Sequence, residues 1–127
     1  MATWEDVGVD SSRAGVELFD AGGSRYRSAV SRFYYAAFAL LTHELSRRGA
    51  PFHAGRETPS HAELPRLVEA YLTQFGEQRR ANIARTLATL YRDRLDADYS
   101  VQRIDKTAAA RAYRRAAAVF TYLGVKA

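Results

Sequence analysis

The sequence predicts an all-α protein, an antiparallel up-and-down helical bundle of four main helices plus a short N-terminal helix. Three observations predict this fold. The three prolines all lie between residues 51 and 65, and glycines mark most of the other interruptions. The segments between these breakers are rich in Ala, Leu, Arg and Glu, which favour helices. Their apolar residues recur at spacings of three and four, and no sustained apolar–polar alternation indicates a strand.

The first two helices are separated by a glycine pair. Val16 and Phe19 anchor a short helix over about residues 12–21, and the glycines at 22 and 23 end it. The second helix is long, from about residue 25 to residue 48, where a glycine and a proline follow. Its apolar positions step by three and four, as a helix that buries one face requires.

The last three helices follow a polar loop over residues 50–63. Pro65 suits the first turn of the third helix, which is expected to continue to Gly76. The fourth helix is expected over about residues 77–98, and Asp105 can cap a fifth over about residues 106–123. Each helix has one apolar face, and short connections between such helices imply antiparallel packing.

Composition and charge exclude several classes of protein. The 127 residues fit one domain, 1–127, with a core at about 12–123. The chain has no cysteine, which excludes disulfides, thiolate metal sites and a cysteine nucleophile. No apolar run reaches the roughly 20 residues that span a bilayer, and the N-terminus does not resemble a signal peptide. We therefore expect a soluble, cytoplasmic protein without membrane contact, whose formal charge of +5 permits a polyanionic partner such as RNA.

The common enzyme motifs are absent from the sequence. The glycine pair at 22 and 23 lacks the spacing of a phosphate-binding loop, and no Glu-x-x-His pair suggests a di-iron bundle. His43 and Glu44 lack the second histidine of a zinc protease motif. We predict no cofactor and no bound metal.

Two charges stand on the apolar side of the fourth helix. On a helical wheel Arg94 lies about 20° from Ile83, and Asp98 about 60° from it. A charge in such a position must be paired or must face a cleft. Arg94 and Asp98 are four residues apart and can pair with each other. Two interpretations stay open: an internal ion pair, or a functional cleft where the helix leaves the bundle.

Two further segments attract attention. Residues 31–35, Ser-Arg-Phe-Tyr-Tyr, form an aromatic cluster at helical spacing, which is usually core. Residues 56–61 contain Arg56 and His61 in a proline-containing loop, where Ser60 and Glu63 also fit a capping box. We favour the capping interpretation for this segment.

Arginines also line the outer faces of the last two long helices. Such faces are usually just solvated, but the excess of basic over acidic residues and the nearby Tyr99 and Tyr113 also fit an RNA-binding surface. The arginines concerned are Arg79, Arg80, Arg85, Arg92, Arg111, Arg114 and Arg115.

Two motifs together resemble the HEPN family (higher eukaryotes and prokaryotes nucleotide-binding). Residues 29–38, Ala-Val-Ser-Arg-Phe-Tyr-Tyr-Ala-Ala-Phe, resemble its second-helix signature. Residues 94–99, Arg-Leu-Asp-Ala-Asp-Tyr, resemble the Arg-x-x-Ala-Asp-Tyr end of the fourth helix in one bacterial and archaeal branch. The resemblance implies an all-α bundle that dimerises. Many members are metal-independent RNases, often toxins, and others are non-catalytic; many are encoded beside a minimal nucleotidyltransferase that acts as antitoxin.

The chain departs from the catalytic motif that this resemblance implies. Active members carry Arg-x(4–6)-His in a dimer cleft, whereas residues 98–101 here are Asp, Tyr, Ser and Val. Tyr99 stands where the histidine of an Arg-x4-His motif would follow Arg94. Arg94 can still supply the cation that stabilises the phosphorane charge, but a tyrosine is a poor base near neutral pH.

These features support two functional hypotheses. In a toxin-like RNase, Arg94 binds phosphate, Asp98 orients Arg94 or acts as base, and Tyr99 contacts the scissile group. In a non-catalytic HEPN module, the same surface binds a nucleotidyltransferase partner or a nucleotide, and Tyr99 is a target of modification by that partner. A purely structural helical adaptor is the third interpretation. Contacts to nucleic acid or to a partner are predicted for Arg32, Tyr35, His61 and Arg92.

Overall fold

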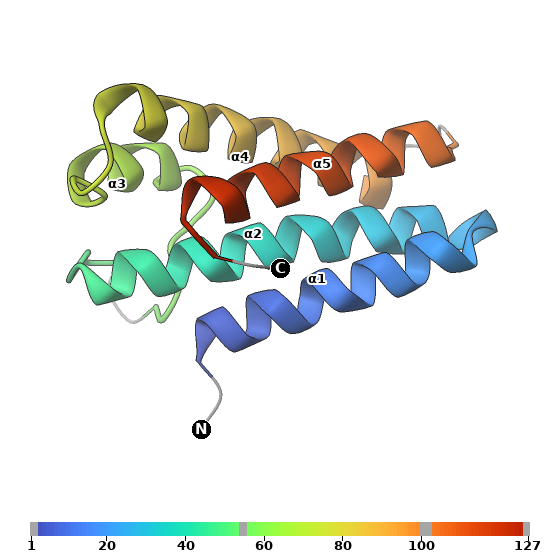
Figure 1. Ribbon diagram of the computed structural model, residues 1–127, viewed down its shortest axis with the longest axis horizontal. Coiled ribbons are helices and arrows are strands. Elements are labelled where there is room, and N and C mark those ends of the chain that lie inside the picture. The colour runs from blue at the N-terminus through green and yellow to red at the C-terminus, as the bar shows by residue number, and fades with distance from the viewer. Residues whose placement is uncertain (1–2, 54–55, 100–102, 126–127) are drawn as a thin grey trace.

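The computed structural model describes residues 3–53, 56–99 and 103–125, which are helical and contain no strand (Figure 1). This confirms the all-α fold class. The elements in chain order are α1 (Trp4–Ala21), the 3-10 turn η1 (Gly23–Arg25), α2 (Tyr26–Arg47), α3 (Leu64–Tyr71), α4 (Glu77–Tyr99) and α5 (Lys106–Tyr122).

The bundle has four long helices and one short one, but the short helix is not the first. α1 has 18 residues, whereas α3 has eight and stops at Tyr71. α1 begins early because Thr3 and Asp6 form a capping box: each side chain accepts a hydrogen bond from the other's backbone N–H, at 3.1 and 2.9 Å. The glycine, aspartate and serines at residues 8–12 are poor helix formers, so packing against α2 overrides local propensity here.

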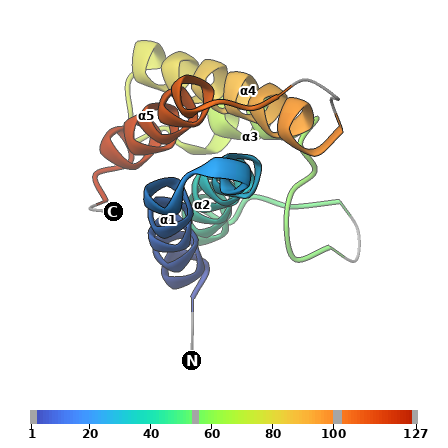
Figure 2. The same cartoon turned by 90° about the vertical axis from the view of Figure 1, so that its right-hand side faces the viewer.

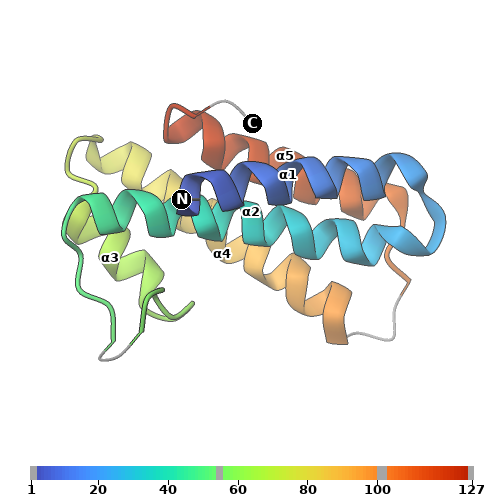
Figure 3. The same ribbon diagram turned by 90° about the horizontal axis from the view of Figure 1, so that it is seen from below.

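Neighbouring long helices run antiparallel in two pairs. α1 and α2 form one pair, and α4 and α5 lie across them as the other (Figures 1 and 2). α2 contacts each of the other four helices, and so it forms the centre of the bundle. α3 lies against α4, at the end of the molecule where α2 finishes (Figure 3).

The core follows from these contacts. α2 contributes the largest buried set, including the aromatic rings of Phe33 and Tyr34. α5 presents a buried row of small residues, Ala109, Ala112 and Ala116, which allows its backbone to lie close to α2. No helix in the described part of the chain is long and apolar enough to cross a membrane.

Two of the arginines expected on outer faces are structural. Both carboxylate oxygens of Asp93 on α4 accept from one terminal nitrogen of Arg115 on α5, at 2.8 and 2.6 Å. Arg80 donates to the carbonyl oxygen of Phe75 at 2.9 Å and lies 3.7 Å from the Glu69 carboxylate of α3. Asp105 caps α5 as predicted, accepting from the N–H of Ala108 at 2.8 Å.

Close contact between α1 and α2 depends on glycine. A Cβ atom on Gly15 would lie 2.6 Å from the ring of Phe33, which is fully buried. We expect Gly15→Ala to lower the free energy of unfolding by about 1–2 kcal/mol, because overpacking outweighs the gain in helix propensity. Urea unfolding followed by circular dichroism measures the change.

The matched control is Gly76→Ala. Nothing lies within 4 Å of a Cβ atom there, and we expect a change of about 0.5 kcal/mol or less. Equal stability of the Gly15 variant and the parent would show that the two helices are free to move apart.

Candidate functional site

The site is centred on Arg94 in the last part of α4. Its side chain is only 16% exposed, and its Nε donates to Oδ2 of Asp98 at 3.1 Å. The predicted pair is therefore formed, one helical turn apart on α4. A guanidinium that is so largely buried needs further partners, which α2 provides.

The rings of two tyrosines on α2 lie against the Arg94 guanidinium. Its central carbon lies 5.4 Å from the ring centroid of Tyr34 and 4.8 Å from that of Tyr35. Both distances are within the range of cation–π attraction. Tyr34 is fully buried, whereas Tyr35 is 43% exposed, so one ring belongs to the core and the other to the surface.

Ser31, one turn earlier on α2, completes the support of Arg94. Its hydroxyl donates to Oδ1 of Asp98 at 2.7 Å, while Oδ2 is engaged by Arg94. Both carboxylate oxygens therefore accept hydrogen bonds that fix the carboxylate. The sequence analysis missed Ser31 as a site residue; its spacing of three and four from Tyr34 and Tyr35 was the available signal.

The loop before α3 brings His61 to the same tyrosine. The hydroxyl of Tyr34 is hydrogen-bonded to Nδ1 of His61, whose ring stacks on Tyr91 of α4 with centroids 4.4 Å apart. The predicted capping box holds this loop: the N–H of Ser60 donates to Glu63 at 2.7 Å, and that of Glu63 to the Ser60 hydroxyl at 3.3 Å. Thus Tyr34 is a shared neighbour of His61 and Arg94.

Burial determines the protonation of this pair. Desolvation, and secondly the positive Arg94, lower the pKa of His61 below its ordinary 6.5. Desolvation raises the pKa of Tyr34, although Arg94 opposes it. Tyr34 therefore keeps its proton near neutral pH, and His61 is held in its neutral form.

A cavity of about 590 Å³ adjoins the Asp98 side of the site. Ser31, Arg32, Tyr35 and Asp98 line it, together with Arg27. Arg27 donates to the carbonyl oxygen of Ala97 at 2.6 Å, near the C-terminal end of α4. The exposed side chain of Arg32 makes no hydrogen bond or ion pair within the described residues, whereas its carbonyl oxygen accepts from the Ser11 hydroxyl at 2.8 Å.

Not every predicted site residue joins this group. The structure brings Arg94, Tyr35 and His61 around Tyr34. Asp98 joins this group through Arg94, and Arg32 lines the neighbouring cavity. Tyr99, the last residue of α4, is 76% exposed and has no ring or hydrogen-bond contact within the described residues. Arg92 is exposed and lies about 200° from Arg94 around the helix, so it belongs to another face.

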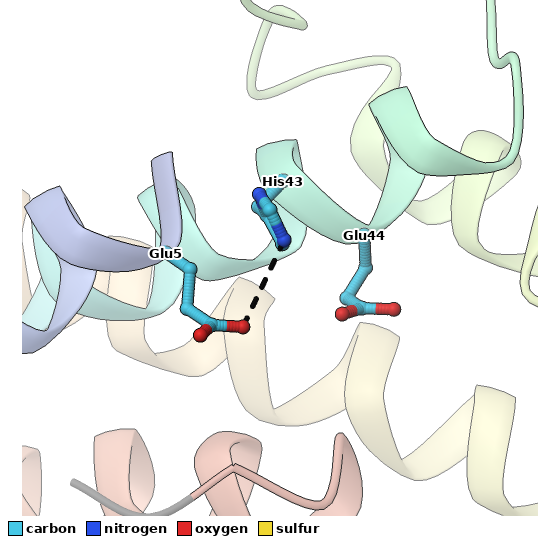
Figure 4. Close-up of side chains that lie close together, drawn as sticks. All are labelled: Glu5, His43 and Glu44. Carbon is cyan, nitrogen blue, oxygen red and sulfur yellow. Dashed lines mark ion pairs between the residues drawn. The ribbon is translucent and has the colours of Figure 1, made fainter. Parts of the chain in front are cut away.

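A separate cluster near the C-terminal end of α2 contains Glu5, His43 and Glu44 (Figure 4). Among the described residues it is the one group of three or more histidine or carboxylate ligands close enough for a metal, with ligand atoms within 4.8 Å of one another. The side chains of this cluster already take part in ion pairs. Nε2 of His43 lies 3.7 Å from Glu5, and Glu44 accepts from Arg47 at 3.2 Å. It links α1 to α2 and is distinct from the site at Arg94.

Comparison with known proteins places the chain in a family. The model of the HEPN domain matches residues 12–126, nearly the whole chain. The chain belongs to the HEPN domain family. HEPN membership supports a nucleotide-binding or RNase-type module, and it confirms the resemblance found in the sequence. No curated protein and no solved structure matches the chain.

The neutral state of His61 predicts a pH dependence of stability. Because its pKa is lower in the folded chain, the unfolded chain binds more protons as the pH falls through about 6.5. The stabilisation is complete above this value and is lost below it. We expect the free energy of unfolding to fall between about pH 7.5 and pH 5, and His61→Gln to reduce this fall while keeping an acceptor for Tyr34. Urea unfolding at a series of pH values tests this.

The control for that series is His53→Gln, which replaces an exposed loop histidine. It should leave the pH profile of the parent unchanged. An identical profile for parent and His61→Gln would contradict the neutral, buried state of His61.

Proposed function

We propose that this HEPN protein is a metal-independent endoribonuclease, and that Arg94 binds the phosphate at which RNA is cleaved. The observation that carries the proposal is the state of the Arg94 guanidinium. Asp98, Tyr34 and Tyr35 fix its position, yet its terminal nitrogens make no hydrogen bond within the described residues. A held guanidinium with free N–H groups suits bidentate binding of a phosphate.

The chemistry assigned to Arg94 needs no metal ion. When the ribose 2′-hydroxyl attacks the neighbouring phosphorus, negative charge accumulates on the phosphate oxygens. Arg94 is held in place before the substrate binds, so it can stabilise this charge without reorganising. Its low exposure strengthens that interaction relative to a fully solvated arginine.

The other residues have supporting roles in the proposal. Asp98 orients Arg94, since both of its oxygens already accept hydrogen bonds. Tyr99 extends from the end of α4 and contacts the scissile group, and His61 provides a further contact to the RNA. Because no histidine follows Arg94, a general base is missing from the family's usual place. General acid–base catalysis contributes about 10²–10⁴-fold, so we expect slow cleavage.

The biological setting belongs to the same proposal. We infer a cytoplasmic homodimer that acts as the toxin-like component of a toxin–antitoxin or defence module, paired with a minimal nucleotidyltransferase. The resemblance of residues 94–99 to one HEPN branch supports this setting. Exposed Tyr35 beside Arg94 fits a cleft shared between two copies.

The second candidate is a non-catalytic HEPN module that binds a nucleotidyltransferase or a nucleotide. The missing histidine and the exposure of Tyr99 favour it. A phenol at the end of a helix, without contacts in the described part of the chain, is accessible to a modifying partner.

Cleavage of total RNA and tRNA in EDTA separates the two candidates. We expect slow cleavage by the parent and a loss of about 100-fold or more for Arg94→Ala, because a preorganised charge donor is removed. The control, Arg48→Ala, removes the same charge at the far end of α2 and should cleave like the parent. Circular dichroism and thermal melting of each variant establish that it is folded.

Two results would redirect the proposal. Absence of cleavage by the folded parent would select the binding module. Undiminished cleavage by folded Arg94→Ala would mean that the Arg94–Asp98 pair is a structural ion pair only.

The dimer can be tested without any substrate. We expect light scattering to give twice the 14.2 kDa mass of the chain at micromolar concentrations. A monomer throughout that range would remove the basis of a shared cleft.

A further inference from the structure

We propose that the groove between α1 and α2 is a subsite for one unpaired RNA base next to the phosphate at Arg94, and that it prefers a base carrying an exocyclic amino group. The inference rests on the proposed function, because it assigns the part of the RNA that adjoins Arg94. It adds a binding site and a base preference that the family match does not provide.

The groove has the size and walls of a small-molecule site. Its volume is about 700 Å³, within the range of ligand cavities. Trp4, Val7 and Ala14 line it from α1, and Tyr35 and Phe38 line it from α2. Aromatic side chains in such a groove can stack on a base, and base–aromatic stacking is the main contact in single-strand recognition.

The groove is continuous in its residues with the site at Arg94. Arg32 and Tyr35 line both this groove and the cavity beside Asp98. The Tyr35 ring also contacts the Arg94 guanidinium, whose central carbon lies 4.8 Å from the ring centroid. The Arg32 side chain is exposed and has no hydrogen bond or ion pair within the described residues, so it is available for a backbone phosphate. An RNA strand can therefore place a base in the groove and its phosphates along Arg32 and Arg94.

Asp10 is the acidic residue of the groove. It lines the cavity and is exposed, and its side chain makes no hydrogen bond within the described residues. A carboxylate accepts hydrogen bonds from base amino groups such as N4 of cytosine. Uracil presents a carbonyl oxygen at the same position, which a carboxylate repels. The preference is therefore for cytosine over uracil.

Charge favours a nucleotide over a protein helix as occupant. The apolar groove shares Arg32 and Tyr35 with the neighbouring cavity, which Arg27 also lines. An apolar face next to two arginines complements a base joined to phosphate.

Trp4 makes the proposal measurable, since it is the only tryptophan of the chain and stands in the groove wall. The probes are non-cleavable 2′-O-methyl tetranucleotides of cytidine and of uridine. We expect both to change the tryptophan emission, with cytidine binding about tenfold more tightly, as a direct base contact predicts. Asp10→Asn should reduce the preference to about twofold or less, since an amide offers a donor as well as an acceptor.

A groove-filling variant provides the second measurement. Ala14→Leu adds bulk to the groove wall and should weaken binding of both probes by about tenfold or more. Its matched control is Ala70→Leu on the exposed side of α3, which should bind like the parent. Thermal melting checks that each variant is folded.

The outcomes separate this inference from the proposed function. RNA cleavage that depends on Arg94 supports the RNase in either case. If Trp4 emission does not respond to the probes, or if Ala14→Leu binds them fully, the groove is not the base subsite. A cytidine-selective response without RNA cleavage supports the base subsite and contradicts the proposed RNase activity. Equal binding of the two probes, or an unchanged preference in Asp10→Asn, overturns the base preference. Emission that depends on protein concentration but not on the probes assigns the groove to a second copy and overturns the inference.

Discussion

The buried Tyr34 side chain is the contact on which the site depends. Its ring contacts the Arg94 guanidinium, and its hydroxyl is hydrogen-bonded to His61 in the loop before α3. Three separate parts of the chain therefore meet at one residue of the central helix. A buried phenol is costly unless its hydroxyl is bonded, so Tyr34 and His61 require each other. Tyr34 therefore helps to position both the loop before α3 and Arg94, the candidate phosphate-binding residue.

The predicted ion pair between Arg94 and Asp98 is formed, and the functional cleft belongs to the proposal. The ion pair exists, but it does not neutralise the arginine on every side. Asp98 takes one N–H of the guanidinium and is itself held by Ser31. An ion pair that only stabilised a helix end would gain little from two tyrosine rings and a serine. In the proposed function, these contacts position the Arg94 cation for a phosphate.

Local features were predictable from the sequence, and contacts distant in the sequence were not. The Arg94–Asp98 pair, the Ser60–Glu63 capping box and the cap at Asp105 each join residues three or four apart, and all are present. Ser31 and Asp98 are 67 residues apart, and Tyr34 and His61 are 27 apart. No periodicity encodes such pairings. The length of α1 was missed for a related reason, because its poor helix formers are stabilised by α2 rather than by one another.

The last turn of α4 is secured from outside its own helix. Helix ends ordinarily fray, because their final carbonyl groups lack partners within the helix. Here Arg27 of α2 binds the carbonyl oxygens of Asp96 and Ala97, and Ser31 binds the side chain of Asp98. Backbone amides in this turn should therefore exchange with solvent more slowly than those of an unanchored helix end. The consequence for the proposed function is kinetic: with Arg94 held in place beforehand, a phosphate would meet a formed site rather than one it must first assemble.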